Sequence, residues 1–401
     1  MKLRPAVALV LSLLVCTAAF AGPTGNGSCM LGAFPGATLL YPYFEADLND
    51  PGHTMLFSVS NLGGTSHIVR VVLWTDYGVP TMAFDLYLKA FDIQTMNLQD
   101  ILNGSLPQTG QGQSLGSFPH CAGTTVLPGG GILAASVARL KARHTGKPDP
   151  GTTVCAGFNH GDSIARGYLT IDVTDQCQPL SPSLGVGTPS LYSPGNSVYY
   201  ASGDPNVLTG DFFFVNNAAN QAEGNEAVHI VSDSSRFQND GTFTFYGRYY
   251  VINGQQQGAR DHRTPLASTW FSRYVNGGPF NGGTNLIIWR EVPSTGVASC
   301  SGAPAWFPLS QERVNATDEA GNLKTIFSGG GFPFPLATQK VAVSQLGGAP
   351  LPGSFGGLQL YLSKSEAHKR QAYVLPVLSA EGRYSLGYNG TRIDDLCGLK
   401  P

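Results

Sequence analysis

The chain has 401 residues, of which only 12% are charged, and its formal net charge at pH 7 is −2. With 51 glycines, 27 prolines and a hydrophobic share of 42%, its composition is typical of an exported, turn-rich β protein with a real core. This composition argues against a disordered chain, and the absence of a basic block argues against binding to nucleic acid or to an anionic membrane. The length predicts two or three domains.

The first 21 residues are predicted to be a signal peptide. Lys2 and Arg4 form a positive start, residues 7–15 are almost continuously apolar, and Ala19 and Ala21 give the small-residue pattern that signal peptidase requires. The apolar run is too short for a permanent membrane span. We therefore expect cleavage before Gly22, export to the periplasm or the exterior, and no membrane insertion.

Short alternating runs bounded by Gly, Asn, Asp or Pro predict β-strands along the rest of the chain. Residues 55–59 and 68–74 are predicted to be antiparallel strands joined through a Gly63-Gly64 turn, and residues 84–88 and 91–98 to continue this meander. Further strands are predicted at 167–173, 211–215, 227–231, 242–250, 286–289, 340–343, 358–362, 372–377 and 383–388.

One helix is predicted at about residues 132–143. Its apolar residues Leu133, Val137 and Leu140 fall on one face, and Gly146 follows as a stop signal. The helix lies in a long segment around residues 100–160 that interrupts the pattern of strands.

The chain also shows an internal similarity. Residues 35–60 and 265–290 align without a gap, and the segments 84–98 and 167–171 resemble 334–343 and 357–361 in the same order. The identical pairs in the first alignment are Pro35/Pro265, Ala37/Ala267, Gly52/Gly282, Thr54/Thr284 and Leu56/Leu286. We therefore predict two immunoglobulin-like β-sandwich modules, at residues 29–235 with the insertion around 100–160 and at residues 240–397.

Six cysteines follow the predicted signal peptide: Cys29, Cys121, Cys155, Cys177, Cys300 and Cys397. An even number in an exported chain, without a Cys-x-x-Cys pair, favours three disulfides over a metal site. The sequence does not fix their connectivity. A Cys155–Cys177 bond is the most local option, and a Cys29–Cys397 bond would join the two ends of the chain.

Four segments carry a resemblance to a known family: 39–45 (LLYPYFE), 74–76 (WTD), 144–146 (HTG) and 283–289 (GTNLIIW). On these motifs the chain resembles a family of exported bacterial β-rich proteins with no known activity. The resemblance implies a bacterial, exported, β-rich protein, and it supplies no catalytic or binding residues.

Three short motifs resemble those of enzymes or enzyme substrates. Residues 112–116 match a hydrolase nucleophile elbow without the required strand and helix, so we predict a flexible loop. Residues 161–164, which follow His160, resemble the opening block of GDSL hydrolases, but we predict a turn in which Asp162 or Ser163 caps backbone amides. Residues 106–110 spell a sortase motif in an internal position, which we interpret as coincidence.

A candidate metal site lies in the acidic turn that contains Glu45, Asp47 and Asp50. Carboxylate oxygens are the ligands that calcium prefers, and calcium sites of exported sandwiches often lie in loops between strands. The alternative is an ordinary Asp-Pro-Gly turn, because the equivalent segment 275–280 of the second half has no carboxylate. Calcium is the one cofactor that the sequence suggests.

Two further features of the sequence bear on function. In the charge cluster at residues 260–263, an enzyme could use Asp261 to orient His262. Adjacent side chains on an extended segment point to opposite faces, so we predict a solvated linker between the modules instead. A surface that stacks against sugar rings is possible if the aromatic side chains are exposed; the candidates are Tyr41, Tyr43, Tyr199, Tyr200 and Trp270.

The function predicted from the sequence is a non-enzymatic interaction or structural role at or outside the bacterial envelope, with an unidentified protein or glycan as partner. No catalytic residues are predicted, because no nucleophile, base or phosphate loop stands in the setting its chemistry requires. One alternative is a carbohydrate- or calcium-binding β-sandwich. The other is a secreted hydrolase whose site is assembled from distant loops, with Asp162, His160 and Glu45 as the example.

Overall fold

The computed structural model describes residues 34–110, 118–119, 131–174, 177, 205–233, 235, 244–246, 251–252, 255–256, 262–292, 298–307, 311–330, 334–347, 349–363, 370–380 and 383–394. The chain is mainly β in these ranges, as predicted from its alternating pattern. The predicted signal peptide lies outside them. Among the described helices, none is long and apolar enough to cross a membrane.

The first half of the chain forms two antiparallel sheets. The five-stranded sheet has the order β10 (Val228–Ile230), β1 (Thr38–Asp47), β7 (Ile164–Thr174), β3 (His67–Thr75) and β4 (Pro80–Leu88). The four-stranded sheet has the order β5 (Ile93–Asn97), β2 (His53–Asn61), β8 (Leu208–Asn216) and β9 (Gln221–Glu226). The sheets face each other, because the ring of Tyr41 on β1 packs edge-on against Phe57 on β2 and Phe212 on β8.

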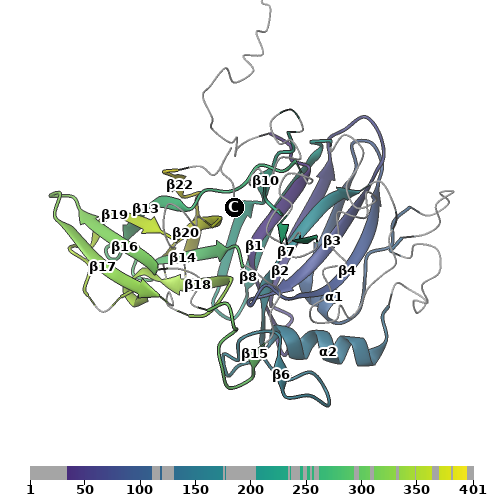
Figure 1. The fold of residues 1–401 in the computed structure, drawn as a ribbon, viewed down its shortest axis with the longest axis horizontal. Coiled ribbons are helices and arrows are strands. Elements are labelled where there is room, and N and C mark those ends of the chain that lie inside the picture. Colours follow the sequence, from purple (N-terminus) through teal and green to yellow (C-terminus); the bar gives the residue numbers. More distant parts are fainter. Residues whose placement is uncertain are drawn as a thin grey trace, which may run out of the picture.

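The second half also forms a five-stranded and a four-stranded antiparallel sheet (Figure 1). The first has the order β17 (Leu323–Gly330), β16 (Gln311–Asp318), β19 (Phe355–Tyr361), β13 (Thr269–Val275) and β22 (Thr391–Arg392). The second has the order β18 (Thr338–Ala342), β14 (Gly283–Arg290), β20 (Ala372–Ala380) and β21 (Tyr384–Gly387). Two short ladders lie outside these sheets, β6 (Val154–Cys155) with β15 (Ala298–Ser299) and β11 (Val251–Ile252) with β12 (Gln255–Gln256).

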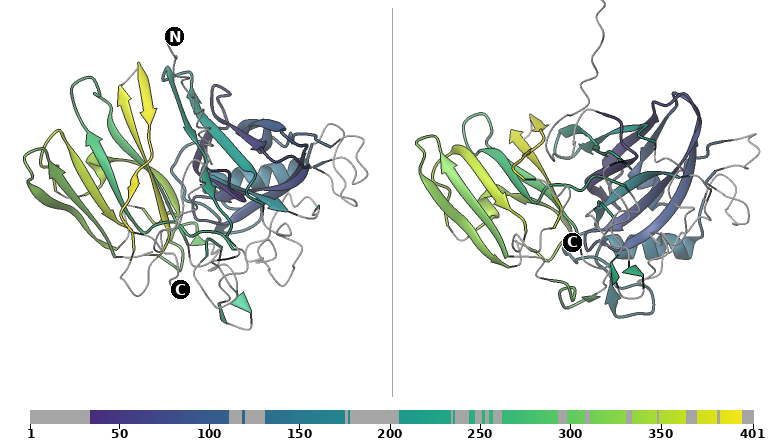
Figure 2. Two further views of the ribbon diagram at one scale, coloured as in Figure 1. Left: turned by 90° about the horizontal axis from the view of Figure 1, so that it is seen from above. Right: turned by 45° about the horizontal axis from the view of Figure 1, so that its top comes forward.

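The two halves share one strand order. When their main strands are matched along the chain, β10-β1-β7-β3-β4 corresponds to β22-β13-β19-β16-β17, and β5-β2-β8-β9 corresponds to β18-β14-β20-β21. The aligned segments 35–60 and 265–290 contain β1–β2 and β13–β14, and residues 167–171 and 357–361 lie in the equivalent strands β7 and β19. Figure 2 shows the two groups of strands side by side.

The predicted pairing of the first strands is wrong. Residues 55–59 and 68–74 do lie in strands, but β2 pairs with β5 and β8, whereas β3 pairs with β4 and β7 in the other sheet. The Gly63-Gly64 segment therefore connects two sheets and does not close a hairpin. The immunoglobulin-like topology is not confirmed either, because β1 and β2 lie in different sheets, whereas the first two strands of a constant-type domain are neighbours.

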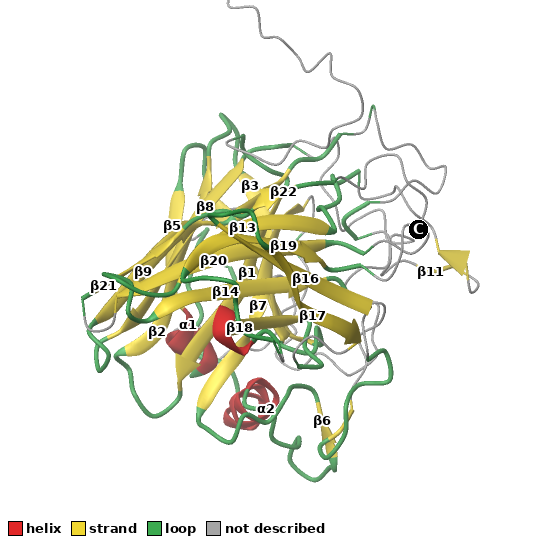
Figure 3. Cartoon of the chain, turned by 90° about the vertical axis from the view of Figure 1, so that its left-hand side faces the viewer, coloured by secondary structure: helices red, strands yellow, loops and turns green. Residues whose placement is uncertain are grey.

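The predicted helix is confirmed as α2 (Ala134–His144), and a shorter helix, α1 (Leu98–Leu102), follows β5. Leu140 and His144 of α2 are buried, and Gly146 has a φ of 65°, the left-handed conformation that commonly ends a helix. A side chain at Gly146 would also collide with the backbone of Phe158. Both helices lie at one end of the molecule, with β6 beside α2 (Figure 3).

A continuous hydrophobic core connects the halves. Tyr168 of β7 stacks on Trp74 of β3 with ring centroids 5.5 Å apart, and it meets the edge of Trp289 of β14 at 6.0 Å. Phe245 stacks on the same Trp289 ring at 5.7 Å. The four-stranded sheet of the second half is therefore covered by the first half on one side, which fixes the arrangement of the two pairs of sheets.

The segment predicted to be a solvated linker is partly buried. The Arg263 side chain has no exposed surface, its Nε lies 3.5 Å from the Asp172 carboxylate, and it also donates to the hydroxyl of Thr38. Tyr246 donates to the same carboxylate at 3.0 Å. A charge cluster read as solvated because of its sequence thus contains an arginine that is buried and paired in the core of the first half.

Candidate functional site

A groove lies where the two halves meet, with a cavity volume of about 320 Å³. Its walls come from β1 and β7 of the first half and from β14, β18 and the segment before β18 of the second half. The lining residues are Tyr43, Glu45, His160, Arg166, Asn285, Phe334, Leu336, Thr338, Gln339, Lys340, Ala342 and Gln345. This volume is at the lower end of the range of about 300–1,000 Å³ that is typical of small-molecule sites.

An ion pair across the two halves forms one wall. The Lys340 ammonium lies 3.5 Å from the Glu45 carboxylate, and both side chains are mostly buried. The Nε2 atom of His53 lies 3.4 Å from the same carboxylate, and the hydroxyl of Tyr43 donates to it at 3.1 Å. Burial opposes the ionisation of Glu45, but Lys340, His53 and Tyr43 outweigh it and hold its pKa well below the ordinary value. Glu45 is therefore a carboxylate at neutral pH.

A buried carboxyl group lies beside this ion pair. Glu223 on β9 is almost fully buried, and its burial raises the pKa of its carboxyl group, although the charge of Lys340 opposes this effect. Lys340 thus lies near two acidic side chains, and Glu45 is the one that forms the ion pair with it.

Two more pairs of polar side chains border the groove. Both guanidinium nitrogens of Arg166 donate to the Asp162 carboxylate at 2.8 Å, a bidentate pair. His160 lies with Nε2 3.2 Å from the buried carboxylate of Asp76. Burial raises the pKa of Asp76, against the opposing effect of His160 and of the Phe158 amide, which donates to it at 3.0 Å.

The aromatic wall of the groove is formed by Phe334. Phe334, which is 43% exposed, lies with its ring centroid 6.0 Å from Phe158, whose ring meets that of His160 at 4.8 Å. Phe158 and Trp306 also pack against a small separate core that contains Tyr77, Val79, Ala156, Ala298 and Leu336. Phe334 was not predicted to be a site residue, because nothing in the sequence around it shows that its segment packs against β1 and β7 of the first half.

The segment that carries Phe334 and Leu336 is fixed to both halves. The buried guanidinium of Arg290 donates to the carbonyl of Leu336 at 2.6 Å. The Ala337 amide donates to the Asp76 carbonyl at 2.7 Å, and the hydroxyl of Thr338 donates to the Pro42 carbonyl at 2.5 Å. The groove walls are therefore pre-organised by hydrogen bonds from buried groups.

A disulfide links the first half of the chain to the second half. Cys155 on β6 is bonded to Cys300, next to β15, over a separation of 145 residues. Cys155–Cys177, the most local of the pairings that the sequence left open, is therefore not formed: β6 pairs with β15, which brings Cys300 and not Cys177 next to Cys155. Cys177 also takes part in a disulfide. Cys29, Cys121 and Cys397 lie outside the described residues, so the predicted Cys29–Cys397 bond stays a prediction.

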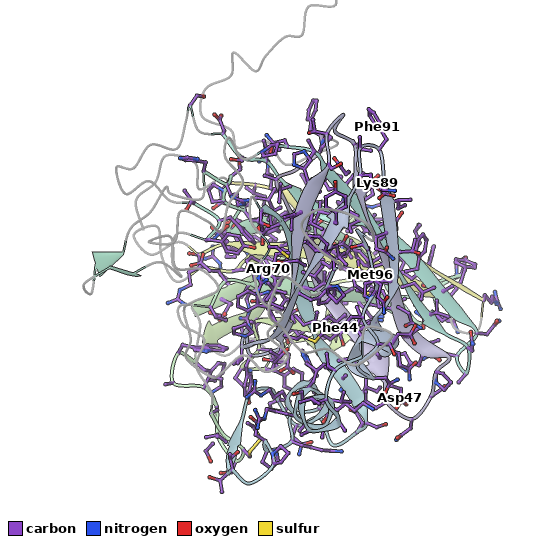
Figure 4. The ribbon with its side chains drawn as sticks, turned by 90° about the vertical axis from the view of Figure 1, so that its right-hand side faces the viewer. Phe44, Asp47, Arg70, Lys89, Phe91 and Met96 are labelled. Carbon is purple, nitrogen blue, oxygen red and sulfur yellow. A yellow bond between two sulfur atoms is a disulfide. The ribbon has the colours of Figure 1, made fainter. Side chains whose placement is uncertain are left out.

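The three residues of the predicted calcium site have separate protein partners. Glu45 belongs to the ion pair in the groove, whereas Asp47 accepts from the Ser163 hydroxyl at 2.6 Å and Asp50 accepts from the Gly52 amide at 2.8 Å. In the described ranges, no group of three or more His, Cys, Asp or Glu side chains has the arrangement of a metal site. Figure 4 shows Asp47 at the opposite end of the molecule from Phe91. Calcium binding stays a prediction.

The predicted enzyme-like motifs have different outcomes. The turn at residues 161–164 precedes β7, and Asp162 accepts from the Ile164 amide at 3.1 Å, as expected for a capping side chain. Residues 112–116 lie outside the described ranges. His160 and Glu45, which were grouped with Asp162 as a possible hydrolytic site, do line the same groove, and Asp162 is paired with a lining residue.

Of the predicted stacking aromatics, the three that the structure describes are not exposed. Tyr41 and Trp270 are core residues, and Tyr43 is buried with its hydroxyl directed to Glu45. Tyr199 and Tyr200 lie outside the described part of the chain. The exposed ring in the groove is that of Phe334.

Comparisons of the chain with protein-family models, with curated proteins and with solved structures found no match. The resemblance of its motifs to an exported bacterial family therefore stays a prediction. The function has to be inferred from the residues of the groove.

Proposed function

We propose that this protein is an exported bacterial binding protein, without catalytic activity, whose ligand site is the groove between its two halves. The observation that supports this most is the composition of the groove, which combines an exposed aromatic ring with polar groups contributed by both halves. Clefts at the contact between two structural units are preferred locations for small-ligand sites, although the lining of this groove is more polar than is usual. Export is supported by the predicted signal peptide and by the disulfide between Cys155 and Cys300.

We further propose that the two halves descend from one duplicated β-sandwich module. Their equal strand order and the sequence identities at equivalent positions support this origin. In this view the groove formed when two copies packed together, so that a binding site arose at the contact between modules. Such contacts between domains are common locations for ligand sites.

A thermal-shift screen tests the binding function. The compounds are small sugars, amino acids, nucleosides and carboxylic acids, and the variant Ala342→Trp places a large side chain in the groove. A compound that binds the groove should raise the unfolding temperature of the wild type, because ligands that bind only the folded state stabilise it. It should not raise that of Ala342→Trp.

The control is Ala135→Trp, at an exposed position on α2 away from the groove. This variant should respond to the ligand as the wild type does. The proposal fails if no compound stabilises the wild type, or if Ala342→Trp and the wild type respond equally.

A second candidate function, hydrolysis, is favoured by the contact between His160 and Asp76. A buried carboxylate that orients a histidine is the arrangement of a general base, and His160 borders the cavity. No serine or cysteine is found among the lining residues that the structure describes, so water would have to be the nucleophile. Hydrolysis of p-nitrophenyl esters that is lost in a folded His160→Gln variant would support this candidate, and equal rates would remove it.

A further inference from the structure

We propose that the ligand of the groove is a neutral saccharide, an inference that rests on the proposed binding function of the groove. The first argument is the balance of charge. Lys340 is paired with Glu45, Arg166 with Asp162, and His160 contacts Asp76. The two basic side chains of the lining, Lys340 and Arg166, thus each have an acidic partner. A charged ligand would have to compete with these partners, and in the mostly buried Lys340–Glu45 pair the loss of a partner is costly.

The second argument is the aromatic wall. Sugar rings have apolar faces formed by C–H groups, and they bury these faces against aromatic rings while their hydroxyls form hydrogen bonds at the rim. Phe334 offers an exposed ring at the cavity, and the ring centroid of Phe158 lies 6.0 Å from it. The aromatic rings and the charged pairs thus provide the two types of surface that a sugar requires.

The third argument is the chemistry of the remaining lining residues. Asn285, Gln339 and Gln345 line the cavity from the second half, and amide side chains both donate and accept hydrogen bonds. Neighbouring hydroxyls of a sugar also donate and accept, so amides match them without a charge. A cavity of about 320 Å³ suits a short saccharide and not a folded partner.

Isothermal titration calorimetry tests this inference with maltose, cellobiose and N,N′-diacetylchitobiose as probes, and with galacturonic acid and lysine as charged comparators. We expect at least one neutral disaccharide to bind the wild type and the charged comparators not to bind. Phe334→Ala should weaken the binding by about tenfold, because it removes one aromatic contact. Phe334→Leu keeps an apolar side chain at this position if the alanine variant fails to fold, and it should also weaken binding.

Phe355→Ala is the matched control, since Phe355 is 41% exposed at the start of β19 and does not line the groove. It should bind as the wild type does. Equal affinities of the Phe334 and Phe355 variants would overturn the inference, as would preferred binding of a charged comparator. If another class of compound stabilises the wild type but not Ala342→Trp, the saccharide inference fails and the binding function stands. If no compound does so, both fail.

Discussion

Glu45 and Lys340 come from different halves of the chain and share a mostly buried contact of 3.5 Å. Lys340 also lies 5.5 Å from the centre of the Phe214 ring, so its ammonium is surrounded by two acidic groups and an aromatic face. Replacing Glu45 by Gln should leave this ammonium without its main counter-charge. We expect a loss of stability of about 3 kcal/mol, the typical cost of removing one partner of a buried pair.

Urea unfolding of Glu45→Gln, Lys340→Met and the double variant measures this coupling. The double variant should be destabilised by less than the sum of the two single variants, because neither charge is then left alone. Additive losses would show that the two groups do not interact in solution.

His144 is the clearest pH-dependent group in the described structure. Burial lowers its pKa to about 4, although the Arg166 carbonyl, 2.9 Å from Nδ1, favours the protonated form. Because the unfolded value is about 6.5, the stability that the neutral ring provides is fully present above pH 6.5 and is lost as the pH falls toward 4. This loss amounts to about 3 kcal/mol over that interval.

A His144→Gln variant removes the titrating group. Its free energy of unfolding should fall less steeply between pH 6.5 and pH 4 than that of the wild type. Ala135→Gln, at an exposed position on α2, removes no titrating group and provides the control; it should keep the wild-type slope. A slope unchanged in His144→Gln would mean that other groups carry the acid sensitivity.

At the scale of single residues, the sequence predicted the types of groups in the groove better than their roles. Glu45, His160 and Asp162 were named as possible site residues, and the structure places the first two at one cavity. Lys340, the partner of Glu45, was not predicted to be a site residue, because the sequence around a charged residue on a strand does not show what that residue contacts. The segment that contains Arg263 was predicted to be solvated for the same reason, since the burial of this charge depends on Asp172, which is distant in the sequence.

At the scale of elements, the β6–β15 ladder and its disulfide connect the insertion of the first half to the second half. The bond closes a long loop, so removing it should destabilise the protein by about 2–5 kcal/mol. We expect a peptide map of the unreduced protein to contain a Cys155–Cys300 peptide, and a Cys155→Ser/Cys300→Ser variant to unfold at lower urea concentration. A Cys155–Cys177 peptide, or unchanged unfolding of the variant, would contradict this expectation.

The alternating patterns located most strands but not their partners. Both β2 and β3 consist of residues that are typical of strands, and the sequence does not show that they lie in different sheets. Only the packing of their side chains in the folded protein separates them. β3 is buried along almost its whole length, because the five-stranded sheet is covered on both faces. An alternating pattern predicts that a strand forms, but it does not predict which other strands lie in the same sheet.

At the scale of the whole molecule, the internal similarity of the sequence corresponds to a strand order that the two halves share. The segments 35–60 and 265–290, and 167–171 and 357–361, lie on equivalent strands of two equally ordered pairs of sheets, whereas residues 84–86 of β4 are matched with residues 334–336, which precede β18. The contact between the pairs was not predictable, because Trp74, Tyr168 and Trp289 meet only after both halves have formed. Their shared core implies that the halves do not behave as independent domains.

The shared core predicts that the halves unfold together. Differential scanning calorimetry should show a single transition whose calorimetric and van't Hoff enthalpies agree. Trp289→Ala should lower the free energy of unfolding of this one transition by about 3–5 kcal/mol, since it removes a fully buried aromatic side chain at the contact. The exposed Phe355→Ala should change it little. Two separate transitions, only one of which moves in Trp289→Ala, would mean that each half has a sufficient core of its own and that the groove between them is free to open.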